Sequence, residues 1–116
     1  MRQAAIIAYI FIALMIPRIG LSEAPTLSIA IHHQQFVPAQ LELPPGVKIK
    51  LTITNKDTLP AEFESYDLSR EIIVSVNQTV TIFIGPLTAG KYEFFNDFNP
   101  DMRGLIVVKP VNGERD

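Results

Sequence analysis

The sequence contains no cysteine in 116 residues, and this absence excludes several kinds of chemistry. The chain cannot form a disulfide, a thiolate metal site or a lipid-linked cysteine, and it has no thiol nucleophile. The formal net charge is only -2 and no basic run occurs, which argues against a nucleic-acid partner. A glycine-rich phosphate loop and a Ser/His/Asp pattern are also missing, so an enzyme is the least favoured class.

The N-terminus has the features of an export signal. A short basic start precedes the unbroken apolar run 4–16, and small residues including Ser22 follow it. The apolar run is too short to span a bilayer comfortably. We therefore predict a secretory signal peptide over residues 1–22 and a periplasmic domain over residues 23–116. An uncleaved N-terminal anchor is the alternative.

The rest of the chain shows the two-residue period of β-strands and no sustained helical period. Segments of alternating apolar and polar residues, separated by Gly, Pro, Asn and Asp, predict about eight strands near 26–33, 40–43, 47–54, 61–65, 72–76, 80–84, 90–97 and 104–109. Residues 66–70 are expected to be irregular or to form one helical turn. This pattern predicts an all-β protein, an antiparallel Greek-key β-sandwich formed by one domain.

The stretch 90–109 indicates which kind of sandwich this is. The stretch contains a strand with alternating aromatic residues, a short polar loop, a methionine and a second apolar strand. This order of features is typical of the end of copper-binding sandwiches. In those proteins this segment supplies a Cys, a His and a Met to one metal. Here Met102 is retained, whereas Asn96 stands at the Cys position and Asn99 at the His position. The fold signal is present without the ligands of a blue-copper site.

Acidic residues offer a different kind of site. Alternation places Glu62 and Glu64 together on the outside of the strand 61–65, and Glu71 follows after one loop. Carboxylates repel each other when they gather on one patch, so a cluster near Asp97 would favour a hard cation such as iron, manganese or calcium. The alternative is a solvated acidic face, the usual environment of scattered Glu and Asp.

The methionine and the two histidines have simpler explanations as well. Met102 can fill a gap in the core rather than bind metal. His33 shares the parity of the apolar residues of the strand 26–33, which predicts a histidine at the edge of the core. His32 points to the opposite face, so the adjacent pair cannot chelate one ion as a unit.

A set of short motifs resembles the EfeO-type cupredoxin-like domain over roughly residues 26–109. The motifs are Phe36-x-Pro38, Pro45-Gly46, Asn55-Lys-Asp57, Ala61-Glu-Phe-Glu-Ser65, Asp67-Leu68, Glu71, Gly85-Pro-Leu87, Gly90-x-Tyr92-x-Phe-Phe95 and Asp97-Phe98-x-Pro100. The resemblance implies a cupredoxin sandwich whose metal site is not blue copper. It also implies a periplasmic role in bacterial iron or copper handling, beside a membrane iron permease.

The same resemblance implies a set of ligands. The acidic residues that match the family pattern are Glu62, Glu64, Glu71 and Asp97. Many relatives carry a His where this chain has Asn99, and often a His at the position of Tyr66. An Asn oxygen can still bind a hard cation, although it is neutral and a poorer donor to a transition metal.

We therefore expect a metal-binding accessory protein for iron or copper, without type-1 copper. Surface carboxylates would capture the ion with Met102 or Asn99 nearby, and the ion would then be handed over to the permease. The alternative is a metal-free sandwich that docks on a membrane transport partner through its acidic face. A metal site requires the side chains of 61–71 and 96–102 to converge, whereas a docking surface needs only a shared face.

Overall fold

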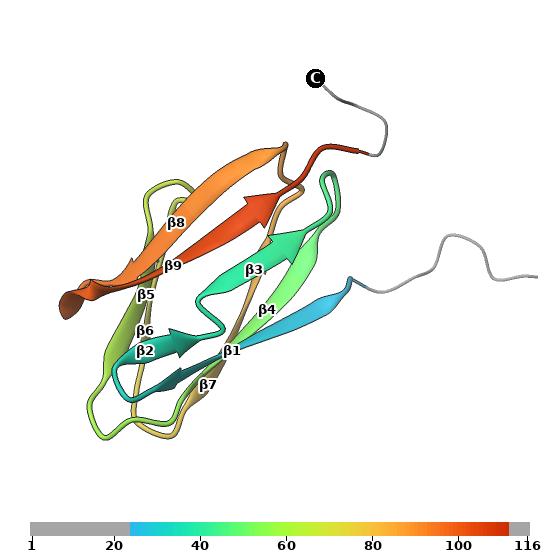
Figure 1. The fold of residues 1–116 in the computed structure, drawn as a ribbon. Helices are drawn as coiled ribbons and strands as arrows, with labels where there is room; N and C mark the ends of the chain where they lie inside the picture. The colour runs from blue at the N-terminus through green and yellow to red at the C-terminus, as the bar shows by residue number, and fades with distance from the viewer. Residues whose placement is uncertain (1–23, 112–116) are drawn as a thin grey trace, which may run out of the picture.

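The structure, a computed structural model, describes residues 24–111 and is a sandwich of two β-sheets (Figure 1). The first sheet has the strand order β2-β1-β4-β7 and the second the order β3-β9-β8-β5-β6. The strands are β1 (Thr26–His32), β2 (Gln35–Val37), β3 (Gln40–Leu43), β4 (Ile49–Asn55), β5 (Ala61–Ser65), β6 (Arg70–Val74), β7 (Thr79–Ile84), β8 (Gly90–Asn96) and β9 (Asn99–Val108). The predicted signal peptide, residues 1–22, lies outside the described residues. Within the described part of the chain, no helix is long and apolar enough to cross a membrane.

The predicted all-β sandwich is confirmed, with differences in strand direction, strand number and strand bounds. The last strand, β9, begins at Asn99, five residues before the predicted start at 104. Each sheet contains one parallel pair, β1 with β4 and β3 with β9, beside its antiparallel pairs. Alternation shows which side chains share a face but does not reveal the direction of the neighbouring strand. The structure also has nine strands rather than eight, because β2 is a separate short strand.

Strand β2 was missed because its turn has no glycine. β1 and β2 form a hairpin in which His33 and Gln34 both have positive φ, 52° and 58°. Such two-residue turns usually contain Asn-Gly or Asp-Gly. Here Asp57 accepts hydrogen bonds from the backbone N–H groups of His33 (2.7 Å) and Gln34 (2.8 Å). The prediction that His33 lies at the edge of the core was wrong, since the strand ends before it and the side chain is exposed.

The core lies between the sheets and contains the inward side chains of both. Three aromatic rings form its centre: Phe94 lies 4.9 Å from Phe36 and 4.9 Å from Phe63, measured between ring centroids. Gly104, opposite Phe94 on β9, leaves space for this ring, and a β-carbon at that position would overlap it. Interiors are packed to nearly crystalline density, so this close approach requires glycine.

The connection between β5 and β6 is a tight turn rather than a helical turn. The Ser65 hydroxyl donates to the Glu93 carbonyl (2.6 Å) and accepts from the Leu68 N–H (3.1 Å). Ser69 closes the turn with a φ of 56°. As a result β6 begins at Arg70, two residues earlier than predicted, and runs directly back along β5.

Candidate metal centre

The acidic residues lie on the outer face of the second sheet, and the strand register brings them together. β5 pairs with β6 so that Glu64 lies opposite Glu71, and it pairs with β8 so that Glu64 lies opposite Phe95. Because side chains alternate along a strand, Glu62 lies on this face two residues from Glu64. Asp97 directly follows the end of β8, after the register shift between Phe95 and Asn96.

Three of these side chains form a compact group, which we call the carboxylate cluster: Glu62, Glu64 and Asp97. One carboxylate oxygen from each lies within 4.8 Å of the others. Asp97 is exposed and Glu64 is half-buried, but Glu62 is only 4% exposed. The expectation that Glu62 lies on the outer face holds, but the side chain is buried there rather than solvated.

Glu62 is a buried carboxyl group that has acids as neighbours and, among residues 24–111, no basic partner. The pKa of Glu62 is raised from 4.5 to about 7, first by burial, then by its side-chain hydrogen bond to Glu71 and the nearby negative charges. The pKa of Glu64 is also raised, by burial and then by the charges of Glu71 and Asp97. Neither of the two ion pairs found among residues 24–111 involves these acids.

Arg103, a positively charged residue of β9, makes its contacts with other residues. Arg103 lies opposite Phe95 in the ladder between β8 and β9, and its guanidinium group sits 5.2 Å from the centre of the Phe95 ring. It also contacts the Glu93 carboxylate at 3.4 Å. The Phe95 ring also packs against Tyr66, with the ring centroids 5.3 Å apart.

The donor atoms and the charge of this group suit a hard cation. The carboxylate cluster offers only oxygen ligands, and Glu71, opposite Glu64 in the ladder between β5 and β6, adds a fourth carboxyl at its edge. Oxygen-rich sites favour iron, manganese or calcium over cuprous copper. A buried carboxyl without a basic partner is also costly for the fold, and a bound cation would remove that cost.

The position that corresponds to the copper-binding Cys is filled by a hydrogen-bonded amide. The Oδ1 atom of Asn96 accepts from the backbone N–H groups of Glu62 (2.9 Å) and Phe98 (3.0 Å). Its Nδ2 atom donates to the Met102 sulfur at 3.5 Å, and the residue is 2% exposed. Asn99, at the position of the His, donates through Nδ2 to the Oε1 atom of Gln34 (3.1 Å). Both amides are therefore engaged in hydrogen bonds with other groups of the protein.

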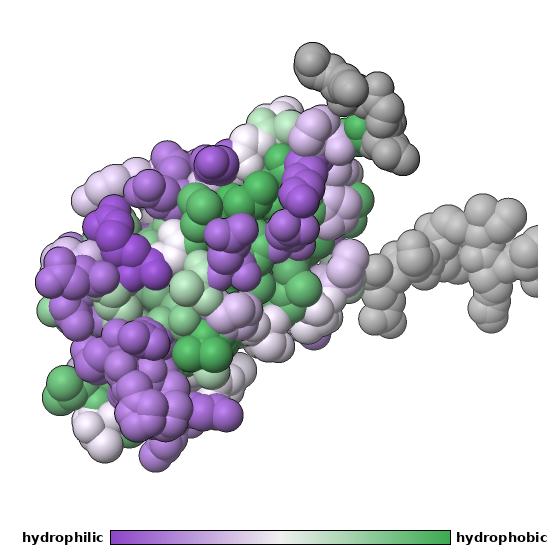
Figure 2. Space-filling model, in the orientation of Figure 1, coloured by the Kyte–Doolittle hydropathy of each residue, from purple (hydrophilic) through white to green (hydrophobic). Residues whose placement is uncertain are grey.

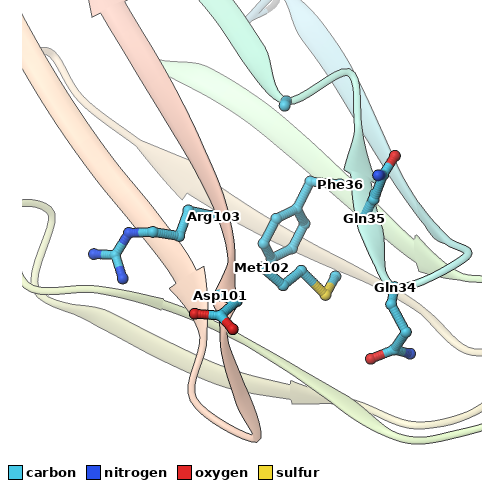
Figure 3. A pocket seen from close by; sticks show the side chains of 7 residues that line it. Gln34, Gln35, Phe36, Asp101, Met102 and Arg103 are labelled. Carbon is cyan, nitrogen blue, oxygen red and sulfur yellow. The ribbon is translucent and has the colours of Figure 1, made fainter.

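Met102 lies on the other side of this amide from the acids. It is 4% exposed, and in Figure 3 it extends from β9 toward Phe36 and Gln34. The hollow at this place has a volume of about 360 Å³ and is lined by Gln34, Gln35, Phe36, Ala39, Asp101, Met102 and Arg103. Among residues 24–111, no second sulfur or imidazole lines it. Met102 belongs to the hydrophobic core, in line with the simpler explanation given above.

The structure thus assembles part of the predicted site. Glu62, Glu64 and Asp97 converge, and Glu71 lies directly beside them. Asn99 and Met102 are directed elsewhere, into contacts with Gln34 and Asn96.

The surface around the β1–β2 turn is polar (Figure 2). His32 and His33 are exposed there, and their rings lie 3.9 Å apart, so the prediction that the two side chains point to opposite faces was wrong. The sequence did not reveal the hydrogen bonds of Asn96. The spacing of the copper ligands showed only that Asn96 stands at the position of the Cys.

Comparisons with known proteins agree with this fold. The family model of the cupredoxin-like domain matches residues 4–108. The uncharacterized protein RP394 of Rickettsia prowazekii (strain Madrid E) is 45% identical over 83 residues, an alignment that covers 71% of this chain and 66% of that protein. The chain therefore spans just under two thirds of that relative's length.

Solved structures show the same architecture. A reduced amicyanin variant aligns with a TM-score of 0.59 and 21% identity, covering 74% of this chain and 82% of amicyanin. The Cu(I)-bound metal-binding domain of the Cu(I)-exporting P-type ATPase CopA from Streptococcus pneumoniae aligns with a TM-score of 0.63 and 18% identity, covering 72% and 83%. The sandwich, the spacing of 96, 99 and 102 and the family match together lead to one conclusion: this chain belongs to the cupredoxin-like domain family.

Proposed function

We propose that this protein is a periplasmic metal-binding accessory protein that captures iron, or alternatively copper, and delivers it to a membrane iron permease. The observation that carries the proposal is the burial of Glu62 among other acids with no basic partner. A fold that retains such a group loses stability unless a cation binds there. The resemblance to EfeO-type domains supports iron as the ion and a permease as the partner.

The arrangement suits capture and release rather than permanent storage. Glu62 is buried and fixed within the sheet, whereas Asp97 is exposed and Glu64 is half-buried. An ion held by these side chains would stay accessible from solvent on one side, so a partner could supply competing ligands. Because Glu62 must lose its proton to bind, uptake of the ion would release protons near neutral pH.

Titration calorimetry of the full chain with ferrous, ferric and cupric ions would test the proposal. We expect micromolar or tighter binding of at least one ion. The double variant Glu62→Gln/Glu64→Gln removes two carboxylates of the cluster and should lose this binding. The matched control is Glu42→Gln/Glu93→Gln, which removes two exposed carboxylates that pair with Lys109 and Arg103 instead.

The outcomes separate the two functions. Binding that survives in the control and disappears in the double variant would support metal handling at the carboxylate cluster. A folded protein that binds none of the three ions would overturn the proposal and favour the metal-free docking module. Equal loss in both double variants would show that the ions respond to net charge and not to a built site.

A further inference from the structure

We propose that Asn96 is a positioning residue that holds Glu62 and Asp97 in the geometry of the carboxylate cluster. This inference rests on the proposed metal-binding function. It assigns a new role to the residue that occupies the Cys position of the copper-binding relatives. Asn96 would not touch the ion. It would fix the two strands that carry the ligands.

The need for such a residue arises at the end of β8, where its ladder with β9 becomes irregular. Strands β5 and β8 pair at Glu64 and Phe95, and the ladder of β8 with β9 has a register shift between Phe95 and Asn96. Irregularities of this kind disrupt the regular backbone hydrogen bonds of a sheet. The cluster therefore lies where backbone pairing alone gives the least control over the spacing of the strands.

The side chain of Asn96 supplies a hydrogen bond between β5 and β8 at this place. Its Oδ1 atom accepts the N–H of Glu62 at 2.9 Å, which ties β5 to β8 at the residue that carries the buried carboxyl. The same atom accepts the N–H of Phe98 at 3.0 Å, so the backbone on both sides of Asp97 is fixed. One oxygen thus connects the main chain of one ligand to the segment that carries another.

The remaining contact of Asn96 fixes the amide itself. Its Nδ2 atom donates to the Met102 sulfur at 3.5 Å, and the side chain is 2% exposed. A buried amide with both ends occupied has one favoured orientation. Met102 would then act as a support for Asn96, which explains why a methionine remains at this place although it does not face the acids.

Electron paramagnetic resonance and calorimetry with cupric ion would test this role. Cupric ion is the most strongly bound divalent ion of its row, so it is a sensitive probe of an oxygen site whichever metal is native. In the full chain, Asn96→Ala should weaken Cu(II) binding roughly 10- to 100-fold, the range found when supporting residues of metal sites are removed. Its Cu(II) spectrum should also change, because the two ligands are no longer fixed. Asn96→Asp keeps the oxygen that accepts from Glu62 and should retain the original spectrum.

Asn55 provides the matched control for a loss of stability alone. It is 1% exposed, and its amide donates to the carbonyls of Leu59 (2.9 Å) and Val74 (3.0 Å). Asn55→Ala should destabilise the fold while leaving the Cu(II) spectrum unchanged. If Asn96→Ala does not fold, Asn96→Ser, whose hydroxyl is too short to reach the Glu62 N–H, carries the same expectation.

The results distinguish the two proposals. No Cu(II) binding by the unmodified protein would overturn both of them. Binding and spectra that are the same in the unmodified protein and in Asn96→Ala would overturn the positioning role and leave the metal site standing. Equal spectral changes in Asn55→Ala and Asn96→Ala would also overturn it, since the effect would then follow general stability.

Discussion

The substitution Glu62→Gln should make the metal-free protein more stable while weakening its metal binding. Gln keeps the size and shape of Glu and removes its charge. In the metal-free state Glu62 is 4% exposed and surrounded by other acids, so its ionised form is unfavourable in the fold. A residue selected for stability alone would not be an acid at this position.

The size of the effect follows from the pKa. Glu62 has a pKa of about 7 in the folded protein, against 4.5 for an unperturbed Glu side chain. The folded state therefore binds more protons between these two values, and the free energy of unfolding falls as pH rises through this window. A pKa shift of this size lowers the free energy of unfolding by about 3 kcal/mol above pH 7, at about 1.4 kcal/mol per pH unit. At about pH 4 the penalty should vanish, because the group is protonated in both states.

Urea and thermal unfolding at about pH 4, pH 6 and pH 8 would measure this effect. We expect Glu62→Gln to raise the free energy of unfolding by about 2–3 kcal/mol at pH 8 and to leave it nearly unchanged at pH 4. For a domain of this size, the melting temperature at pH 8 should rise by roughly 10–20 °C. All measurements need a chelator, since bound metal would stabilise the unmodified protein.

The matched control is Glu42→Gln. Glu42 is an exposed acid that pairs with Lys109 at 3.2 Å, and removing it should change the stability by less than about 1 kcal/mol at either pH. If Glu62→Gln destabilises the metal-free protein at pH 8, Glu62 has a favourable partner in the fold and the reasoning is wrong. A gain of the same size at pH 4 and pH 8 would likewise refute the electrostatic explanation.

Three further predictions concern the site and the core. Metal affinity should rise with pH between about 6 and 8, because Glu62, whose pKa is about 7, must be ionised to bind; calorimetry at several pH values would show this, and a flat profile would contradict it. Met102→Leu should change the metal affinity less than about threefold, since the swap conserves volume and the Asn96 oxygen keeps its hydrogen bonds to the Glu62 and Phe98 N–H groups; a loss of binding would show that the site needs Met102, either as a ligand or through Asn96. Gly104→Ala should destabilise the protein by about 1–3 kcal/mol in urea unfolding, because the added carbon overlaps the buried Phe94 ring; an unchanged stability would contradict that packing.

Much of the fold could be predicted from local patterns. Alternation over 49–55 and 61–65 identified the strands and their inward faces, because the period of two residues depends only on the pleat. The turn at 33–34 could not be predicted, because its conformation depends on Asp57, which lies more than 20 residues away in the sequence. Its two residues carry none of the usual turn chemistry.

The candidate site could likewise be predicted only in part. Glu62 and Glu64 were expected on one face because they are two residues apart on a strand. Their approach to Asp97, more than 30 residues later, depends on the register between β5 and β8, and a shift of one residue would turn these side chains to the opposite face. Asn99 and Met102 follow the spacing of copper ligands. That spacing does not show which way their side chains point in a chain that lacks the Cys and the His.

The sequence by itself determined the class of sandwich, the absence of a thiolate ligand and the oxygen-rich chemistry of its acids. Residue types and their spacing establish these features wherever the chain folds. Only the tertiary structure decided that Glu62 is buried, that the acids converge and that Asn96 connects the strands that carry them. Those properties arise from contacts between distant segments, where strand register and burial set the distances and the local dielectric that give the side chains their chemistry.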